Sequence, residues 1–203
     1  RHWREPGLVE RLRSWVAAGG SLIGIGEPSA EPFGGSYFQL SDVLGVDRET
    51  GRSICSVKYA FSPLSGTHFV TQDLQGAPDL GRDVDGIHVL DGETMVVAER
   101  GGSPTIAVRQ YGQGRSMYLS GFVCSLANTR LLHRGIAWCA RKEAEFPRWT
   151  SEDFRLECAW YPAKRTLVVI NNCGEPVSTR VFDGEGDTVP VSVEAHGIAI
   201  VER

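Results

Sequence analysis

Two polar residues that could bind a sugar, Glu27 and Ser29, stand directly after a short apolar segment of the chain. A carboxylate and a hydroxyl at that place can bind sugar hydroxyls, and Phe33, Tyr37 and Phe38 can supply an apolar stacking face. A structural explanation is simpler, because polar side chains at strand ends often satisfy turns, and the rings can pack the loop or an interface. We therefore hypothesise that this loop faces another part of the assembled protein instead of forming an independent ligand pocket.

The glycines before this loop suggest a dinucleotide-binding turn only superficially. Gly24 and Gly26 follow a predicted strand, and Asp47 lies near the distance expected of a ribose-binding acid. However, Ser29 stands where the third glycine belongs, and Pro28 disrupts the helix N-terminus that should receive the pyrophosphate. The pattern therefore argues against nucleotide binding.

No catalytic nucleophile can be assembled from the sequence motifs. An amidotransferase needs a cysteine on a strained turn between a strand and a helix, served by a histidine and an acid. Cys124 comes nearest, but the sequence contains no GxCxG, GxSxG or His-x-Glu motif. A small buried hydrophobe is the simpler interpretation of Cys124, and we expect no catalytic residue in this chain.

Metal sites and disulfide bonds are not indicated either. The odd number of cysteines and the lack of CxxC pairs favour free thiols in a cytoplasmic protein. No histidine pairs with another histidine or a cysteine at metal-ligand spacing. Four aspartates of a predicted loop, Asp79, Asp83, Asp85 and Asp91, lack the spacing and the final glutamate of a calcium loop, so we interpret them as solvated turn residues. The cysteines are Cys55, Cys124, Cys139, Cys158 and Cys173.

Length and charge restrict the class of protein. The 203 residues allow one large domain, or one medium and one small domain, and the chain carries a formal net charge of -4. Without a stripe of Lys and Arg, that charge argues against nucleic acid and anionic membranes. No apolar run approaches the ~20 residues of a membrane span. Because Arg1 stands in place of an initiator Met or signal peptide, we expect a fragment of a longer protein whose partners are sugars or protein surfaces.

The elements that must position Glu27 follow an α/β pattern. Apolar residues recur at helical spacing from Leu8 to Val16, Gly19-Gly20 end this helix, and Ser21 to Gly26 is predicted to be a buried strand. A short helix is expected from Gln39 to Leu44. Further along we predict a strand from Phe69 to Thr71, a hairpin of Ile87 to Leu90 with Thr94 to Glu99 through Asp91-Gly92, a hairpin of Thr105 to Gln110 with Arg115 to Ser120, and a helix from Leu126 to Arg141.

The hydrophobic period changes near residue 150, which predicts a second, all-β domain. Glu143 to Ser151 is the expected linker, because Pro147 cannot donate a hydrogen bond to a continuing helix. A domain of this small size forms only a marginal core by itself. We therefore expect it to pack on a neighbour. Its predicted strands are Phe154 to Trp160, Thr166 to Ile170, Val177 to Phe182, Thr188 to Val193 and Ile198 to Val201.

Several of these segments together resemble one protein family. The GEPSA segment, the FQLSDVLGVD segment with its RETG continuation, and the Lys58-Tyr59 pair are similar to the central domain of the lacto-N-biose/galacto-N-biose phosphorylases, the 1,3-β-galactosyl-N-acetylhexosamine phosphorylase family. The resemblance implies an α/β domain over residues 1–148, itself similar to glutamine-amidotransferase and β-galactosidase-trimerisation domains. It further implies a small C-terminal β domain over residues 149–203.

The resemblance also implies the activity of a longer parent protein. Such a phosphorylase cleaves a β-1,3-galactosyl-N-acetylhexosamine with inorganic phosphate, its co-substrate, and yields α-galactose 1-phosphate and the free N-acetylhexosamine. The family's catalytic (β/α)8 barrel, with its general acid and phosphate clamp, lies upstream of this region, and the family suggests a homodimer without a further cofactor. The chain is then a structural part of the enzyme. Accessory domains of a β-galactosidase, a carbohydrate-binding module, an amidotransferase-like module and a rhamnose-linked relative remain as alternatives.

Overall fold

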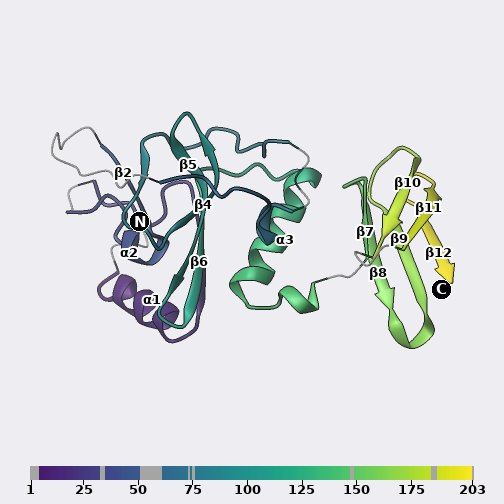
Figure 1. Ribbon diagram of the computed structural model, residues 1–203, viewed down its shortest axis with the longest axis horizontal. Helices are drawn as coiled ribbons and strands as arrows, with labels where there is room; N and C mark the ends of the chain where they lie inside the picture. The colour runs from purple at the N-terminus through teal and green to yellow at the C-terminus, as the bar shows by residue number, and fades with distance from the viewer. Residues whose placement is uncertain are drawn as a thin grey trace. The chain divides into compact units, whose positions relative to one another are not determined.

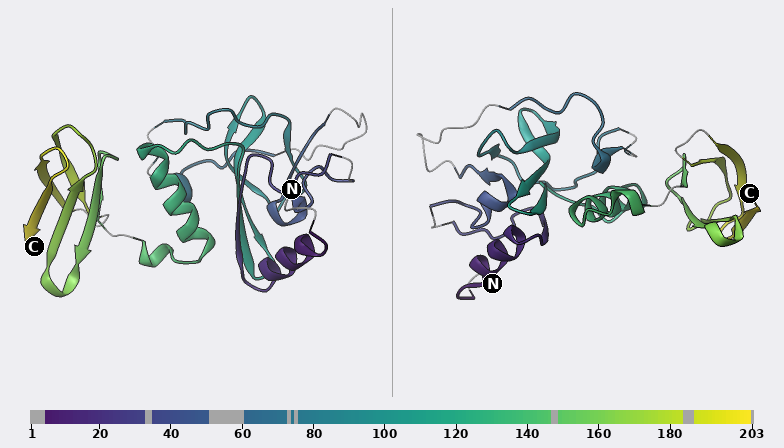
Figure 2. Two further views of the ribbon diagram at one scale, coloured as in Figure 1. Left: turned by 180° about the vertical axis from the view of Figure 1, so that it is seen from behind. Right: turned by 60° about the horizontal axis from the view of Figure 1, so that its bottom comes forward.

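The computed structural model describes residues 5–32, 35–50, 61–72, 74, 76–146, 149–183 and 187–202 (Figures 1 and 2). The residues named in the sequence analysis that lie outside these ranges are Arg1, Phe33, Cys55, Lys58, Tyr59 and Pro147. The chain divides into two compact units: unit 1 holds residues 1–124 and 131–143, and unit 2 holds residues 125–130 and 144–203. No helix within the described ranges is long and apolar enough to cross a membrane.

Unit 1 is built on a sheet in which only one strand pair is parallel. The strand order is β1-β6-β5-β4, with β1 parallel to β6 and the other two pairs antiparallel. β2 and β3 pair with each other in a separate, antiparallel ladder. The strands are β1 (Ser21–Ile25), β2 (Val46–Arg48), β3 (Ile87–Val89), β4 (Met95–Arg100), β5 (Ser103–Tyr111) and β6 (Gly114–Leu119), and the α-helices are α1 (Leu8–Ala17), α2 (Ser41–Leu44) and α3 (Leu126–Cys139).

Apolar side chains from alternate positions of β6 form a core on each face of this sheet. On one face Met117 packs with Leu131 and Cys139 of α3. On the other face Tyr118 packs with Phe38 and Leu44. The described chain as a whole is mostly β-sheet with few helices, so the expected α/β class is met only around the parallel pair.

The end of α1 is fastened to the turn between β5 and β6. The amide of Gly20 donates to the carbonyl of Trp15 at 2.9 Å, which ends the helix where the glycine pair predicted. The amide of Gln113, in the β5–β6 turn, donates to the carbonyl of Ala17 at 2.9 Å. Gly114 follows this turn with no space for a side chain, because a Cβ there would collide with the carbonyl oxygens of Val16 and Gly20.

Unit 2 contains two three-stranded sheets that share one hydrophobic core. The orders are β12-β9-β8 and β11-β10-β7, and the core takes Leu167 and Val169 from the first sheet and Val181 and Val191 from the second. The five strands expected from the sequence are confirmed within a few residues at their ends. The strands are β7 (Thr150–Ser151), β8 (Leu156–Tyr161), β9 (Thr166–Asn171), β10 (Val177–Phe182), β11 (Thr188–Val193) and β12 (Ile198–Glu202).

Two predictions about unit 1 are wrong. The segment Phe69–Thr71 is a 3₁₀ turn, because the imidazole of His68 accepts a hydrogen bond from the amide of Val70 at 3.1 Å and so caps the turn. The hairpin expected at Asp91-Gly92 does not form, since β3 pairs with β2 and β4 pairs with β5. The hairpin of β5 and β6 is confirmed.

Candidate functional site

Glu27 lies at the carboxyl end of the parallel strand pair, the edge at which α/β sheets commonly place functional groups. The amide of Gly26 donates to the carbonyl of Leu119, the last residue of β6, at 2.9 Å. The phenol of Tyr118 donates to the carbonyl of Gly26 at 3.0 Å. These two bonds fix the backbone from which the Glu27 side chain projects.

Glu27, Tyr37 and Arg48 form a partly exposed polar cluster at this edge. The Tyr37 phenol donates to Glu27 Oε1 at 2.9 Å, and Arg48 forms an ion pair with the same oxygen. Arg48 also donates to the Tyr37 oxygen at 3.2 Å and lies 5.3 Å from the ring centroid. Burial, with the hydrogen bond to Glu27 after it, raises the pKa of Tyr37. The Glu27 side chain keeps 43% of its surface exposed, so the cluster is open to a partner.

Ser29 and Phe38 are part of the interior, in contrast to their expected place on a contact surface. Both are 0% exposed. The Ser29 hydroxyl accepts from the amide of Leu40 at 3.0 Å, and Ser29 adopts a φ of 56°, which few non-glycine residues do. The Phe38 ring lies 5.8 Å from the ring of Tyr118. The prediction that Phe38 supplies a stacking face is therefore wrong, while the roles expected for Glu27 and Tyr37 stay predictions.

Asp47 fixes the path of the loop through hydrogen bonds to main-chain amides. The residue is 7% exposed, and its carboxylate accepts hydrogen bonds from the amides of Tyr37 at 3.1 Å, Phe38 at 2.7 Å and Arg48 at 2.8 Å. A carboxylate so occupied and buried has no access to a ribose. The structure thus agrees with the argument against nucleotide binding, and it reveals a positioning residue whose role no spacing in the sequence indicated.

Gly24 and Cys124 are the residues on which the dinucleotide-binding and amidotransferase alternatives depended. A Cβ at Gly24 would lie 2.9 Å from the Pro28 ring, so this glycine permits close packing of the loop. Cys124 is an exposed free thiol, which corrects the expectation that it is buried, and no hydrogen bond joins it to a histidine among the described residues. Burial raises the pKa of Cys139 to about 12 and that of Cys158 to about 11, so both are poor nucleophiles.

The predicted acidic loop does not gather into a metal site. Within the part of the chain that the structure describes, no group of three or more His, Cys, Asp or Glu side chains could hold a metal ion. Asp79 accepts from the amide of Gly81 at 2.9 Å, as a turn residue does, and Asp83 forms an ion pair with Arg100.

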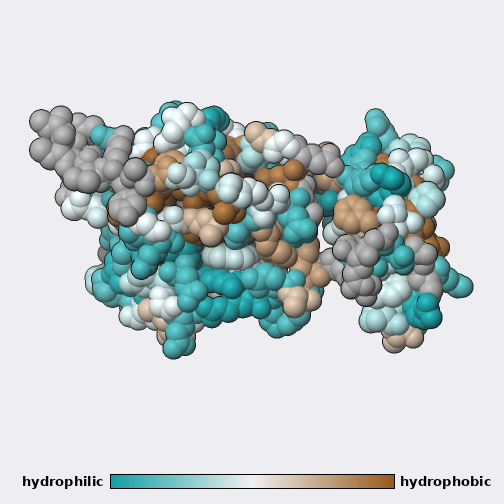
Figure 3. All heavy atoms as spheres, in the orientation of Figure 1, coloured by the Kyte–Doolittle hydropathy of each residue, from teal (hydrophilic) through white to brown (hydrophobic). Residues whose placement is uncertain are grey.

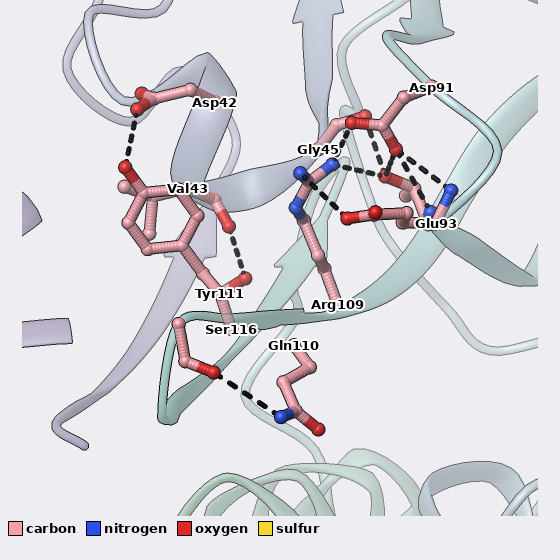
Figure 4. A network of polar contacts seen from close by, with 11 residues as sticks. Asp42, Val43, Gly45, Asp91, Glu93, Arg109, Gln110, Tyr111 and Ser116 are labelled. Atoms are coloured by element: carbon pink, nitrogen blue, oxygen red, sulfur yellow. Dashed lines mark hydrogen bonds and ion pairs between the residues drawn. The ribbon is translucent and has the colours of Figure 1, made fainter. Parts of the chain in front are cut away.

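A second polar network, absent from the sequence analysis, connects α2 with β5 (Figure 4). Arg109 is nearly buried and forms an ion pair with Asp91, and it donates to the Thr94 hydroxyl at 3.1 Å. The Asp91 carboxylate also accepts from the amide of Glu93 at 3.0 Å, and Thr94 donates to the carbonyl of Gly45 at 3.2 Å. Burial by itself would raise the pKa of Asp91, but the hydrogen bond and charge of Arg109 outweigh burial and lower it below its usual value. Asp91, predicted to lie in a hairpin turn, is thus a member of this network instead.

Replacing Arg109 with Met should lower the free energy of unfolding at pH 7 by about 1–2 kcal/mol, because Asp91 loses its charged partner. The ionised Asp91 contributes stability above its unfolded pKa, and this contribution disappears as the pH falls through the lower folded pKa. The variant should therefore show a shallower loss of stability below about pH 4. Urea unfolding at pH 7 and at pH 3 measures both effects. Arg11→Met, which removes an exposed pair with Glu5, is the control, and equal losses in the two variants would contradict the prediction.

The comparison with solved structures concerns the fold. Over 96% of this chain and 30% of the other chain, the structure is similar to a β-galactosidase from Rahnella sp. R3, with a TM-score of 0.52 and 17% identity. The similarity concerns the fold alone, and it extends over less than a third of the β-galactosidase chain.

Sequence comparison then gives the family. The family model of the lacto-N-biose phosphorylase central domain matches residues 1–144, and that of the C-terminal domain matches residues 149–201. The chain belongs to the lacto-N-biose phosphorylase family, as its resemblance predicted. It is 36% identical over 197 residues to a 1,3-β-galactosyl-N-acetylhexosamine phosphorylase of Lachnoclostridium phytofermentans, covering 97% of this chain and 27% of that protein. A phosphorylase of the same description from Bifidobacterium longum subsp. longum is 32% identical, with 97% of this chain and 30% of that protein covered.

Proposed function

We propose that the chain is the non-catalytic central and C-terminal part of an inverting glycoside phosphorylase. The parent would convert a β-1,3-galactosyl-N-acetylhexosamine and phosphate to α-galactose 1-phosphate and the N-acetylhexosamine. The observation that carries this proposal is the match of two family-model domains, central and C-terminal, to nearly the whole chain. The chain spans less than a third of the length of the relatives named above, which leaves ample length for a catalytic barrel.

The chemistry of the proposed reaction explains why the chain alone should be inactive. An inverting phosphorylase needs one carboxylic acid to protonate the leaving oxygen, while phosphate attacks from the opposite face of the sugar. Glu27 accepts from the Tyr37 phenol and pairs with Arg48 through the same oxygen, so this oxygen is already occupied by partners within the chain. Arg48 is likewise engaged by Glu27 rather than free to bind phosphate. We therefore assign the acid and the phosphate clamp to the barrel.

The finer features of the proposal concern organisation. The two domains are residues 1–148 and 149–203, and the parallel pair β1 and β6 between helices supports an amidotransferase-like arrangement for the first. The described cysteines are free thiols, which supports a cytoplasmic protein. We further propose a homodimer, in which the Glu27 to Phe38 loop faces the catalytic barrel or the partner subunit.

Phosphorolysis assays test the proposed function directly. Phosphate consumption is measured with galacto-N-biose, lacto-N-biose and a galactosyl-rhamnose, for the 203-residue chain and for the full-length parent. We expect turnover by the parent on a β-1,3-linked substrate and none by the chain above a buffer blank. Turnover by the isolated chain, or a parent that hydrolyses the substrates without using phosphate, would overturn the proposal.

The hydrolytic outcome corresponds to the second candidate function, an accessory part of a β-galactosidase, which the structural similarity to the Rahnella enzyme favours. Phosphate dependence separates the two candidates, because a hydrolase releases free galactose whereas a phosphorylase releases galactose 1-phosphate. An amidotransferase-like module would instead depend on Cys124. If the Cys124→Ala variant keeps the activity of the wild type, an amidotransferase-like module is excluded.

Substitutions in the polar cluster should affect the parent more than the chain. Glu27→Ala and Tyr37→Ala should each lower kcat/KM of the parent about tenfold or weaken its assembly, because they alter a partly exposed contact surface. The fold of unit 1 should persist, since Glu27 is partly exposed and Tyr37 is only partly buried against the core. Steady-state kinetics and sedimentation measure the two effects. Ser36→Ala, an exposed change in the same loop, is the control; wild-type kinetics and oligomeric state for all three variants would show that the loop is only local packing.

A further inference from the structure

The two outer faces of unit 2 differ in polarity. On the outer face of β10 and β11, the hydroxyls of Ser178 and Ser192 hydrogen-bond at 2.9 Å, and Arg180 forms an ion pair with Glu152 at 2.6 Å. Such a face is ordinary solvent-exposed surface. The β8–β9–β12 sheet presents a different outer face.

The register of that sheet brings six mainly apolar side chains together on its outer side. Inward-pointing residues alternate with outward-pointing ones, and the inward set, which includes Leu167 and Val201, contributes to the shared core. The outward set has nine positions, of which Glu157, Thr166 and Glu202 are polar and lie in its two end rows. The other six are cross-strand neighbours: Ile198 beside Ile170, Ile200 beside Val168 and Ala159, with Tyr161 at the end of β8. We name these six residues the outer apolar face.

No described residue of unit 2 covers the outer apolar face. Ile198 is 63% exposed, Ile200 is 69% exposed and Tyr161 is 52% exposed. Hydrophobic atoms accordingly appear at the margin where β12 lies (Figure 3). β12 is also an edge strand, and its one charged residue, Glu202, stands at its end, so the rest of the strand lacks the charges and prolines with which proteins usually protect such edges.

We propose that the outer apolar face binds the part of the parent chain that precedes the central domain. The inference rests on the proposed function, in which this chain is the central and C-terminal part of a longer phosphorylase. The size of the face selects the occupant. Three strands ~4.8 Å apart and about five residues of ~3.3 Å make roughly 200 Å², whereas a stable interface between separate proteins needs about 800 Å² on each partner. A segment of the same polypeptide can use a small face, because its tether keeps it at an effective concentration of about a millimolar.

Thiol labelling of Ile200→Cys tests the proposal. The variant is made in the full-length parent and in the 203-residue chain, and a maleimide is followed by peptide mapping, which separates the new thiol from the native cysteines. We expect the parent to react at least about tenfold more slowly than the chain at this position, since a covered thiol reacts only through the fraction of molecules that opens. Ser192→Cys, on the polar outer face, is the matched control and should react equally in both proteins.

Three results would overturn the proposal. Equal rates for Ile200→Cys in parent and chain mean that the face is open; slow labelling already in the 203-residue chain means that unit 1 covers it; slow labelling of the parent that is lost on dilution to the monomer assigns the face to a second copy. The test is independent of the phosphorolysis assay. A parent that uses phosphate but leaves the face open refutes only the docking, and a protected face in a parent without phosphorolysis refutes only the function.

Discussion

Replacing Gly114 with Ala should destabilise unit 1 by about 4 kcal/mol or more, a large part of the stability of a typical domain. The added Cβ would collide with the carbonyl oxygens of Val16 and Gly20, which are backbone atoms and cannot rotate away. The collision would separate the end of α1 from the β5–β6 turn, where Gln113 and Ala17 are hydrogen-bonded.

Thermal unfolding followed by circular dichroism, together with the yield of soluble protein, measures this effect. Gly35→Ala is the matched control, because a Cβ at Gly35 meets nothing within 4 Å. We expect the control to be neutral or slightly stabilising, by up to about 1 kcal/mol. Insoluble Gly114→Ala beside soluble Gly35→Ala is an expected outcome. Melting temperatures within a degree of each other would contradict the steric argument.

Replacing Asp47 with Ala should cost about 3 kcal/mol, because three backbone amides lose a charged acceptor and the amide of Phe38 is buried. Asp47→Asn should cost about half as much, since its remaining carbonyl oxygen can still accept from Phe38 and Arg48. Urea unfolding gives the two energies.

Hydrogen exchange locates the consequence of the Asp47 substitutions. Amides of Tyr37 and Phe38 should exchange faster in Asp47→Ala, whereas those of β12 in unit 2 should not change. If exchange of the loop stays as slow as in the wild type, Asp47 is not what fixes it.

Local signals in the sequence predicted a large part of this fold correctly. The β5–β6 hairpin was predictable because glycines permit positive φ in the turn between its strands, and Gly112 does take a φ of 58°. Unit 2 was predictable because its strands alternate between core and surface. Long-range contacts decided the rest. Asp91-Gly92 has the residues of a hairpin turn, yet Asp91 binds Arg109, eighteen positions further along the chain, and the two strands join different partners.

Two members of the polar cluster, Glu27 and Tyr37, were named from the sequence, but the contacts that join them were not predicted. Glu27 and Tyr37 are hydrogen-bonded at a strand end. Their partner Arg48 and the buried Asp47 both belong to β2, and they contact the loop only because the chain returns to it at this strand. No spacing of residues encodes that return. The burial of Ser29 and Phe38 follows from the same closure of the chain.

The contacts of Asp47 leave the side chains of the loop open to change. Among the described residues its carboxylate hydrogen-bonds only to main-chain amides, which every residue except proline possesses. The path of the loop is therefore largely independent of which side chains stand at positions 27 and 37. A lineage can exchange those side chains, and with them whatever the loop contacts, while the scaffold below keeps its shape.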